Sequence, residues 1–136
     1  MKTLLTALPN YIAGSISLTF GIIYLVKSSF LKYHGQALEK KWIHVEREVQ
    51  ILMLALMRVV GGGALATGFV ILILQYQFDK YHQAWIPTTI LIAGGLLSLT
   101  SLYAMLSVTL QTKGRPPIGV ILVSLLLMIV GFFLNS

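Results

Sequence analysis

The sequence contains no cysteine and few charged side chains among its 136 residues. The absence of cysteine excludes a disulfide framework, a thiolate metal site, a thiol nucleophile and thiol-based redox chemistry. Asp, Glu, Lys and Arg together make up 10% of the residues, whereas a typical soluble domain has about 25%. So few charges cannot cover the surface of a water-soluble domain of this length, which indicates a membrane protein.

Hydrophobic residues make up 57% of the chain and gather in four long runs. A helix rises about 1.5 Å per residue, so about 20 apolar residues cross the roughly 30 Å hydrocarbon core of a bilayer. The runs lack the polar and apolar alternation of barrel strands. We therefore predict an all-α integral membrane four-helix bundle, a single domain of residues 1–136, with spans at about 5–26, 49–74, 85–110 and 117–134.

The first span can also be interpreted as a cleaved signal peptide. Pro9 and Asn10 interrupt the apolar core that such a peptide needs, and the apolar run continues through Val26. We therefore expect an uncleaved helix that begins near Pro9, because proline is tolerated in a first helical turn.

Lysine and arginine are distributed unevenly between the two sides of the predicted bundle. The loops after the first and third spans hold seven of them, and the other side has only Lys2 and Lys80. The positive-inside rule therefore predicts a multi-pass protein with both termini outside and both basic loops in the cytoplasm. The net charge of +6 is explained in this way, so membrane lipids are expected as partners and nucleic acid is not.

The first loop, residues 27–48, is predicted to be largely helical. Its apolar residues recur every three or four positions and continue in phase into the second span. We expect one long second helix that begins near Gln36 and extends either into the cytoplasm or along the membrane surface. The residues of this apolar stripe are Leu38, Trp42, Val45, Val49, Leu52 and Leu56.

His44 and Glu48 are four residues apart, which places them on one face of the expected helix. Such a pair is a candidate general acid and base, since imidazole titrates near neutral pH. The alternative, which we favour, is a hydrogen-bonded surface pair. The segment has no HExxH motif and no second histidine at helical spacing, so neither a metal site nor another cofactor is predicted.

Arg58 lies nine positions inside the second predicted span. An arginine deep in a membrane helix costs roughly 2.5 to 3.5 kcal/mol on insertion scales, so a compensating partner is expected. No acidic residue falls inside the predicted spans, which leaves carbonyls, hydroxyls, lipid phosphates, water or a bound anion as partners. Arg58 is therefore a candidate ligand-binding residue, and the alternative is a side chain that reaches back to the interface.

Small residues recur at helical spacing in three of the spans. Lipid chains compete with apolar side chains, so small residues that permit close approach promote helix packing. We predict that the first three spans pack closely; as an alternative, three successive glycines loosen the second helix and expose carbonyls one turn from Arg58. The candidate packing residues are Ala13, Ser17, Gly21, Gly61, Gly62, Gly63, Gly94 and Ser98.

Several short motifs are spread along the chain: Tyr33-His34, Ala37-Leu38, Trp42, Glu48, Gln50, the run from Leu54 to Gly63, Leu102-Tyr103-Ala104 and Pro116-Pro117. Together they resemble a family of small bacterial four-span membrane proteins, over nearly the whole chain. The resemblance implies a location in the bacterial inner membrane and no particular activity.

Two functions are left open by the sequence. The first is a non-enzymatic membrane protein that packs through its small residues, either with itself or as an accessory subunit. The second is a small enzyme or binder of an anionic lipid or amphiphile, in which Arg58 holds the charge and His44 with Glu48 transfers protons. The two hypotheses differ in the role that they give to Arg58.

Overall fold

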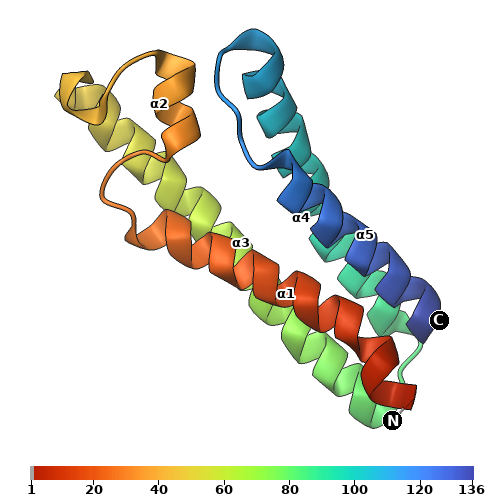
Figure 1. The fold of residues 1–136 in the computed structure, drawn as a ribbon. Helices are drawn as coiled ribbons and strands as arrows, with labels where there is room; N and C mark the ends of the chain where they lie inside the picture. Colours follow the sequence, from red (N-terminus) through yellow and green to blue (C-terminus); the bar gives the residue numbers. More distant parts are fainter. Residues whose placement is uncertain (1) are drawn as a thin grey trace.

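The computed structural model describes residues 2–136 and the side chains from residue 5 onward, and every regular element in this range is helical (Figure 1). Both termini lie at one end of the bundle, which we call the terminal end. The opposite end, which carries the short helix α2, we call the α2 end. The elements are α1 (Lys2–Val26), α2 (Lys32–Leu38), the 3-10 turn η1 (Trp42–His44), α3 (Arg47–Tyr81), α4 (Trp85–Gln111) and α5 (Ile118–Asn135).

The four long helices, α1, α3, α4 and α5, are each long and apolar enough to cross a membrane. Large apolar side chains cover much of their exterior, and a few polar side chains are buried in the apolar core. Asn10 and Gln75 are almost completely buried, whereas large apolar side chains such as Val59, Leu96 and Phe133 are exposed. An apolar exterior with hydrogen-bonded polar groups inside suits a hydrocarbon surrounding.

Helix α1 packs most extensively against α3, and α5 packs against both α1 and α4. The contact between α1 and α3 is close because small residues line it. The Ser17 hydroxyl donates a 2.8 Å hydrogen bond to the carbonyl of Ala64. A methyl group at Gly61 would lie 2.9 Å from the carbonyl oxygen of Gly21 and from Cβ of Tyr24, so only glycine fits there.

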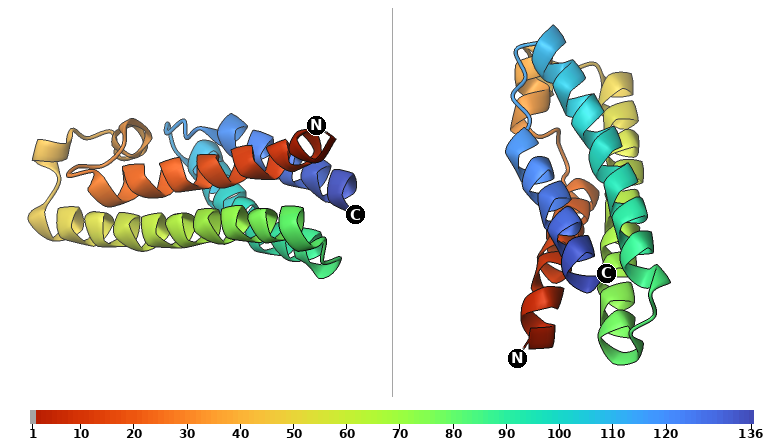
Figure 2. Two further views of the ribbon diagram at one scale, coloured as in Figure 1. Left: turned by 90° about the horizontal axis from the view of Figure 1, so that it is seen from below. Right: turned by 90° about the vertical axis from the view of Figure 1, so that its right-hand side faces the viewer.

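Helix α3 is much longer than its neighbours. Its 35 residues give it a length of about 52 Å. Because Gly61 lies beside Tyr24, the end of α1 at Val26 falls at about the level of Arg58. Residues 47–56 of α3 continue beyond α1 at the α2 end, for about 15 Å (Figure 2).

The expectation of one continuous second helix from Gln36 is wrong. Helix α2 ends before Glu39, which has a left-handed φ of 51°, and Val45 and Glu46 are extended between η1 and α3. The Trp42 ring meets that of Phe30 edge-on at 5.0 Å. The helix that leaves the bundle therefore begins at Arg47.

Two other boundaries differ from expectation. Helix α1 includes Pro9 in its interior and does not begin there. Helix α3 continues past position 74 to Tyr81, because the polar side chains of its last turns have partners on α1. Gln75 accepts a 2.7 Å hydrogen bond from Asn10, and Asp79 accepts one of 2.9 Å from Tyr11. An acidic residue, Asp79, therefore lies within a candidate membrane-spanning helix.

Candidate functional site

Arg58 lies on an exposed face of α3 and makes no hydrogen bond or ion pair with the described residues. It lines neither of the two large cavities. It lies at about the level at which α1 ends.

His44 and Glu48 do not share a helix face. His44 belongs to η1 and Glu48 to the first turn of α3, and the extended residues Val45 and Glu46 separate them. Both side chains are exposed, and no hydrogen bond joins them in the part of the chain that is described. Within residues 2–136, no group of three or more His, Asp or Glu side chains is placed to hold a metal ion.

The candidate packing residues occupy different environments. Ala13, Ser17, Gly21 and Gly61 lie between α1 and α3. Gly94 lies against the side chain of Met128 on α5, and Ser98 is buried on α4. A methyl group at Gly62 or Gly63 would meet nothing within 4 Å, so these two glycines face away from the contact with α1.

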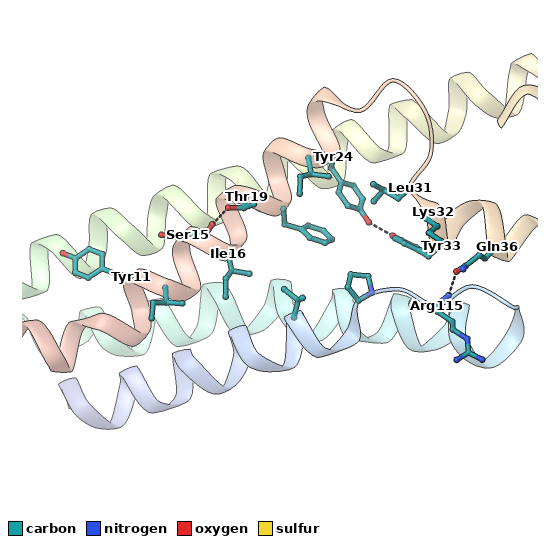
Figure 3. A pocket seen from close by; sticks show the side chains of 15 residues that line it. Tyr11, Ser15, Ile16, Thr19, Tyr24, Leu31, Lys32, Tyr33, Gln36 and Arg115 are labelled. Carbon is teal, nitrogen blue, oxygen red and sulfur yellow. Dashed lines mark hydrogen bonds between the residues drawn. The ribbon is translucent and has the colours of Figure 1, made fainter. Parts of the chain in front are cut away.

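The largest cavity, which we call the α1 groove, has a volume of about 840 Å³ and lies between α1, α2 and the start of α5 (Figure 3). Along α1 it extends from Tyr11 to Tyr24, a rise of about 20 Å. That is about two-thirds of the roughly 30 Å hydrocarbon core. Its apolar wall consists of Ile12, Ile16, Phe20, Ile23, Leu31, Pro117 and Val120.

The sequence of α1 gives the helix two distinct faces. Ile12, Ile16 and Ile23 recur at helical spacing and line the groove. The small residues Gly14, Ser17 and Gly21 face α3. The groove face also carries Ser15 and Thr19. The Thr19 hydroxyl donates a 2.8 Å hydrogen bond to the carbonyl of Ser15, so this hydroxyl has its hydrogen-bond partner within the helix.

The mouth of the α1 groove forms where α2 docks on the loop between α4 and α5. The backbone N–H of Arg115 donates a 3.3 Å hydrogen bond to Oε1 of Gln36. Gly114 is buried in this contact, and a methyl group there would lie 2.9 Å from the carbonyl oxygen of Tyr33. An exposed ion pair between Lys113 and Glu39, 2.9 Å long, adds a weaker link.

Lys32 and Arg115 are the two charged residues that line the α1 groove, and both are cations. Their side chains are exposed at the mouth. None of the described lining residues is a carboxylate, so no acid competes for these charges inside the groove. The mouth is therefore arranged to attract an anion while the rest of the groove is apolar.

Tyr24 and Tyr33 meet at the inner end of the mouth, where their hydroxyl groups form a hydrogen bond (Figure 3). Burial raises the pKa of Tyr33, so this phenol is neutral at physiological pH. The pair supplies a polar and uncharged element between the two cations and the apolar wall.

Sequence reasoning counted Lys32 and Arg115 only as orientation signals. The two residues are 83 positions apart, the difference between 115 and 32. Their proximity depends on the docking of α2, which no periodic pattern encodes. The buried Gly114 was the one local signal, since a glycine beside Arg115 permits close backbone approach.

No protein-family model, curated protein or solved structure matches this chain in sequence or fold. The resemblance to small bacterial four-span proteins stays a prediction.

Proposed function

We propose that the chain is a multi-pass protein of the bacterial inner membrane, with the α2 end in the cytoplasm and both termini outside. The exposed apolar side chains and the four apolar helices support the insertion. The positive-inside rule supports the orientation. Seven lysines and arginines lie in or beside the segments that connect helices at the α2 end, whereas the terminal end has Lys2 and Lys80.

Within that membrane, we propose that the protein binds an anionic amphiphile in the α1 groove. The observation that carries this proposal is an apolar groove of about 840 Å³ that ends at two cations, Lys32 and Arg115. The apolar tail would lie along α1, and the phosphate or carboxylate would lie at the mouth. This is the second of the two hypotheses from the sequence, with different residues in the binding role.

The chemistry of the mouth fits a lipid head group at an interface. The guanidinium of Arg115 can form two parallel hydrogen bonds with a phosphate or carboxylate, and Lys32 adds a mobile point charge. Each basic residue near an anionic membrane surface contributes about 1 kcal/mol of attraction. Gln36 holds the backbone of Arg115 in place. Part of the entropy cost of ordering Arg115 is therefore met before the ligand binds.

The test is native mass spectrometry of the intact chain, purified in parallel as wild type, Lys32→Gln/Arg115→Gln and Arg58→Gln. All three are reconstituted with the same mixture of phosphatidylcholine and phosphatidylglycerol. Because two charge contacts are removed, the double variant should retain phosphatidylglycerol at least about tenfold less well. Arg58→Gln should behave like the wild type, because Arg58 lies outside the groove.

Two results would contradict the proposal. Equal retention of phosphatidylglycerol in all three proteins would remove the mouth as a binding site. A loss of phosphatidylglycerol in Arg58→Gln alone would identify Arg58, the candidate from the sequence, as the binding residue. The proposal concerns binding and not catalysis, and a proton-transfer role for His44 and Glu48 stays a prediction.

The packing hypothesis keeps one supporting observation. A methyl group at Gly62 on α3 would meet nothing within 4 Å, and nearby Ala66 is exposed. Small residues on an outer face permit a second helix to approach. We propose self-association through this face as a second candidate function; a monomeric mass that Gly62→Leu leaves unchanged would contradict it.

A further inference from the structure

A second cavity of about 500 Å³ lies on the other side of Tyr24 and Tyr33, which line both cavities. Four helices contribute to it: the end of α1, α2, the first half of α3 and the second half of α4. Unlike the α1 groove, it has no charged residue among the described residues that line it. An anion would lose its hydration in this cavity without gaining a countercharge, so a neutral ligand is favoured.

His34 supplies the one ring N–H donor of this cavity. Its Nδ1 accepts a 3.2 Å hydrogen bond from the backbone N–H of Leu31, which assigns the proton of the neutral ring to Nε2. Nε2–H has no partner among the described residues. Burial lowers the pKa of His34, which keeps the ring neutral at physiological pH.

The remaining surface of the cavity favours a flat ring. Met53, Met57 and Met105 line it together with the ring of Tyr33, which lies 4.1 Å from that of His34. Thioether sulfurs make favourable contacts with the edges of planar rings, and aromatic rings stack on them. A carbonyl on such a ring would accept the hydrogen bond from Nε2–H of His34.

We propose that this second cavity binds a neutral amphiphile of the quinone class, with the Nε2–H of His34 donating a hydrogen bond to a ring carbonyl and the methionines contacting the ring. The apolar tail would leave between α3 and α4 towards the lipid. The site goes beyond the proposed binding of an anionic amphiphile, and it uses neither Lys32 nor Arg115. Failure of one proposal therefore leaves the other testable.

Gly63 provides a sharp test because it lines the cavity and a methyl group there meets nothing within 4 Å. Gly63→Leu should therefore fill the cavity without disturbing the packing of the helices. Gly119→Leu is the matched control, since it adds the same side chain to a helix glycine where there is equal room but outside the lining of the cavity. Both substitutions also raise helix propensity.

The probe is a benzoquinone with a decyl tail, added in a concentration series to the full chain in phosphatidylcholine nanodiscs and measured by native mass spectrometry. We expect saturable binding that Gly63→Leu weakens about tenfold or more and that Gly119→Leu leaves unchanged. His34→Phe keeps a ring but removes the donor, and should weaken binding roughly three- to tenfold. His34→Gln keeps an N–H at similar reach and should restore most of the affinity.

Three outcomes would overturn the proposal. Binding that does not saturate would mean that the quinone only dissolves in the lipid. Equal effects of Gly119→Leu and Gly63→Leu would show that the cavity is not the site. Dioctanoylglycerol, a neutral ester without a ring, serves as the competing ligand. If it binds as tightly as the quinone or more tightly, and if its binding depends on His34, the ligand of the cavity is a glyceride and not a quinone.

Discussion

The hydroxyl groups of Tyr24 and Tyr33 are hydrogen-bonded to each other, which ties the last turns of α1 to the start of α2. Each tyrosine is also held by a ring: Tyr24 stacks on Phe20 at 4.4 Å, and Tyr33 lies 4.1 Å from His34. The pair lines both cavities. The same contact therefore positions α2 and forms the wall between the two candidate sites.

Tyr24→Phe should loosen α2 without unfolding the bundle. The substitution leaves the Phe20 stack in place and removes one hydroxyl, a loss of about 1 kcal/mol. Hydrogen exchange of the α2 amides, residues 32–38, should become faster, while exchange in α1 and α3 stays the same. Tyr103→Phe is the control, because Tyr103 is 77% exposed. Unchanged exchange in α2 would show that the hydroxyl pair does not hold the helix.

Gly61→Leu and Gly62→Leu should differ in thermal stability although the two glycines are adjacent. A side chain at Gly61 meets the backbone of Gly21, so α1 and α3 must separate, at a cost of roughly 1–3 kcal/mol. A side chain at Gly62 projects into open space. Melting in detergent should therefore shift downward for Gly61→Leu alone, and equal shifts would argue against the close contact of α1 with α3.

The buried amide pair gives a third prediction. Asn10 donates a 2.7 Å hydrogen bond to Gln75, and both side chains are almost completely buried. Gln75→Leu leaves the Asn10 amide without this acceptor, which should cost about 1–3 kcal/mol. Replacing both residues by leucine should cost less than the sum of the single changes, because the Asn10 amide is then no longer buried without its acceptor. A purely additive double-mutant cycle of unfolding would contradict this coupling.

His34 should make the docking of α2 sensitive to pH. Burial lowers the pKa of His34 in the folded chain below the ordinary value of about 6.5. The unfolded chain therefore binds the proton first as the pH falls, so stability is full above about pH 6.5 and decreases below it. Protonation of Nδ1 would also remove the acceptor for the Leu31 N–H.

The measurement for this prediction is the melting temperature between about pH 7.5 and about pH 5.5. The wild type should lose stability over that interval more steeply than His34→Gln, which does not titrate. Parallel curves would assign the pH dependence to other groups.

The orientation can be tested because the chain has no native cysteine. Single cysteines at Lys41 and Gln111 report on the α2 end, and cysteines at Gln83 and Ser136 report on the terminal end. An impermeant maleimide applied to intact cells should label positions 83 and 136 only, as the positive-inside rule requires. Labelling of positions 41 and 111 alone would reverse the orientation.

The long apolar runs were sufficient to predict the four long helices, because hydrophobic length and proline positions are local signals. Residue 117 was expected to begin the last helix, and α5 begins at Ile118. The break after α2 was not predictable in this way, since the apolar period continues through it. Helix α2 turns aside because Gly114, far away in the sequence, offers a surface for Tyr33 to pack on.

The same limit explains the position of Arg58. Counting along the second run gives the distance of Arg58 from Val49, but not which part of a neighbouring helix lies beside it. The contact of Gly61 with Tyr24 sets that alignment, and such a contact is a property of the assembled bundle. Lys32 and Arg115 were missed for the same reason.

The unequal helix lengths give the bundle two different ends. At the terminal end, Asn135 of α5 donates a 3.0 Å hydrogen bond to the carbonyl of Thr6 on α1, which joins the ends of these two helices. At the α2 end, α3 continues about 15 Å beyond α1, and Lys32, His34 and Arg115 lie there. In a bilayer, lipids of one leaflet would reach both mouths by lateral diffusion, while those of the other leaflet would first have to flip. The fold would therefore select the leaflet before any head group is recognised.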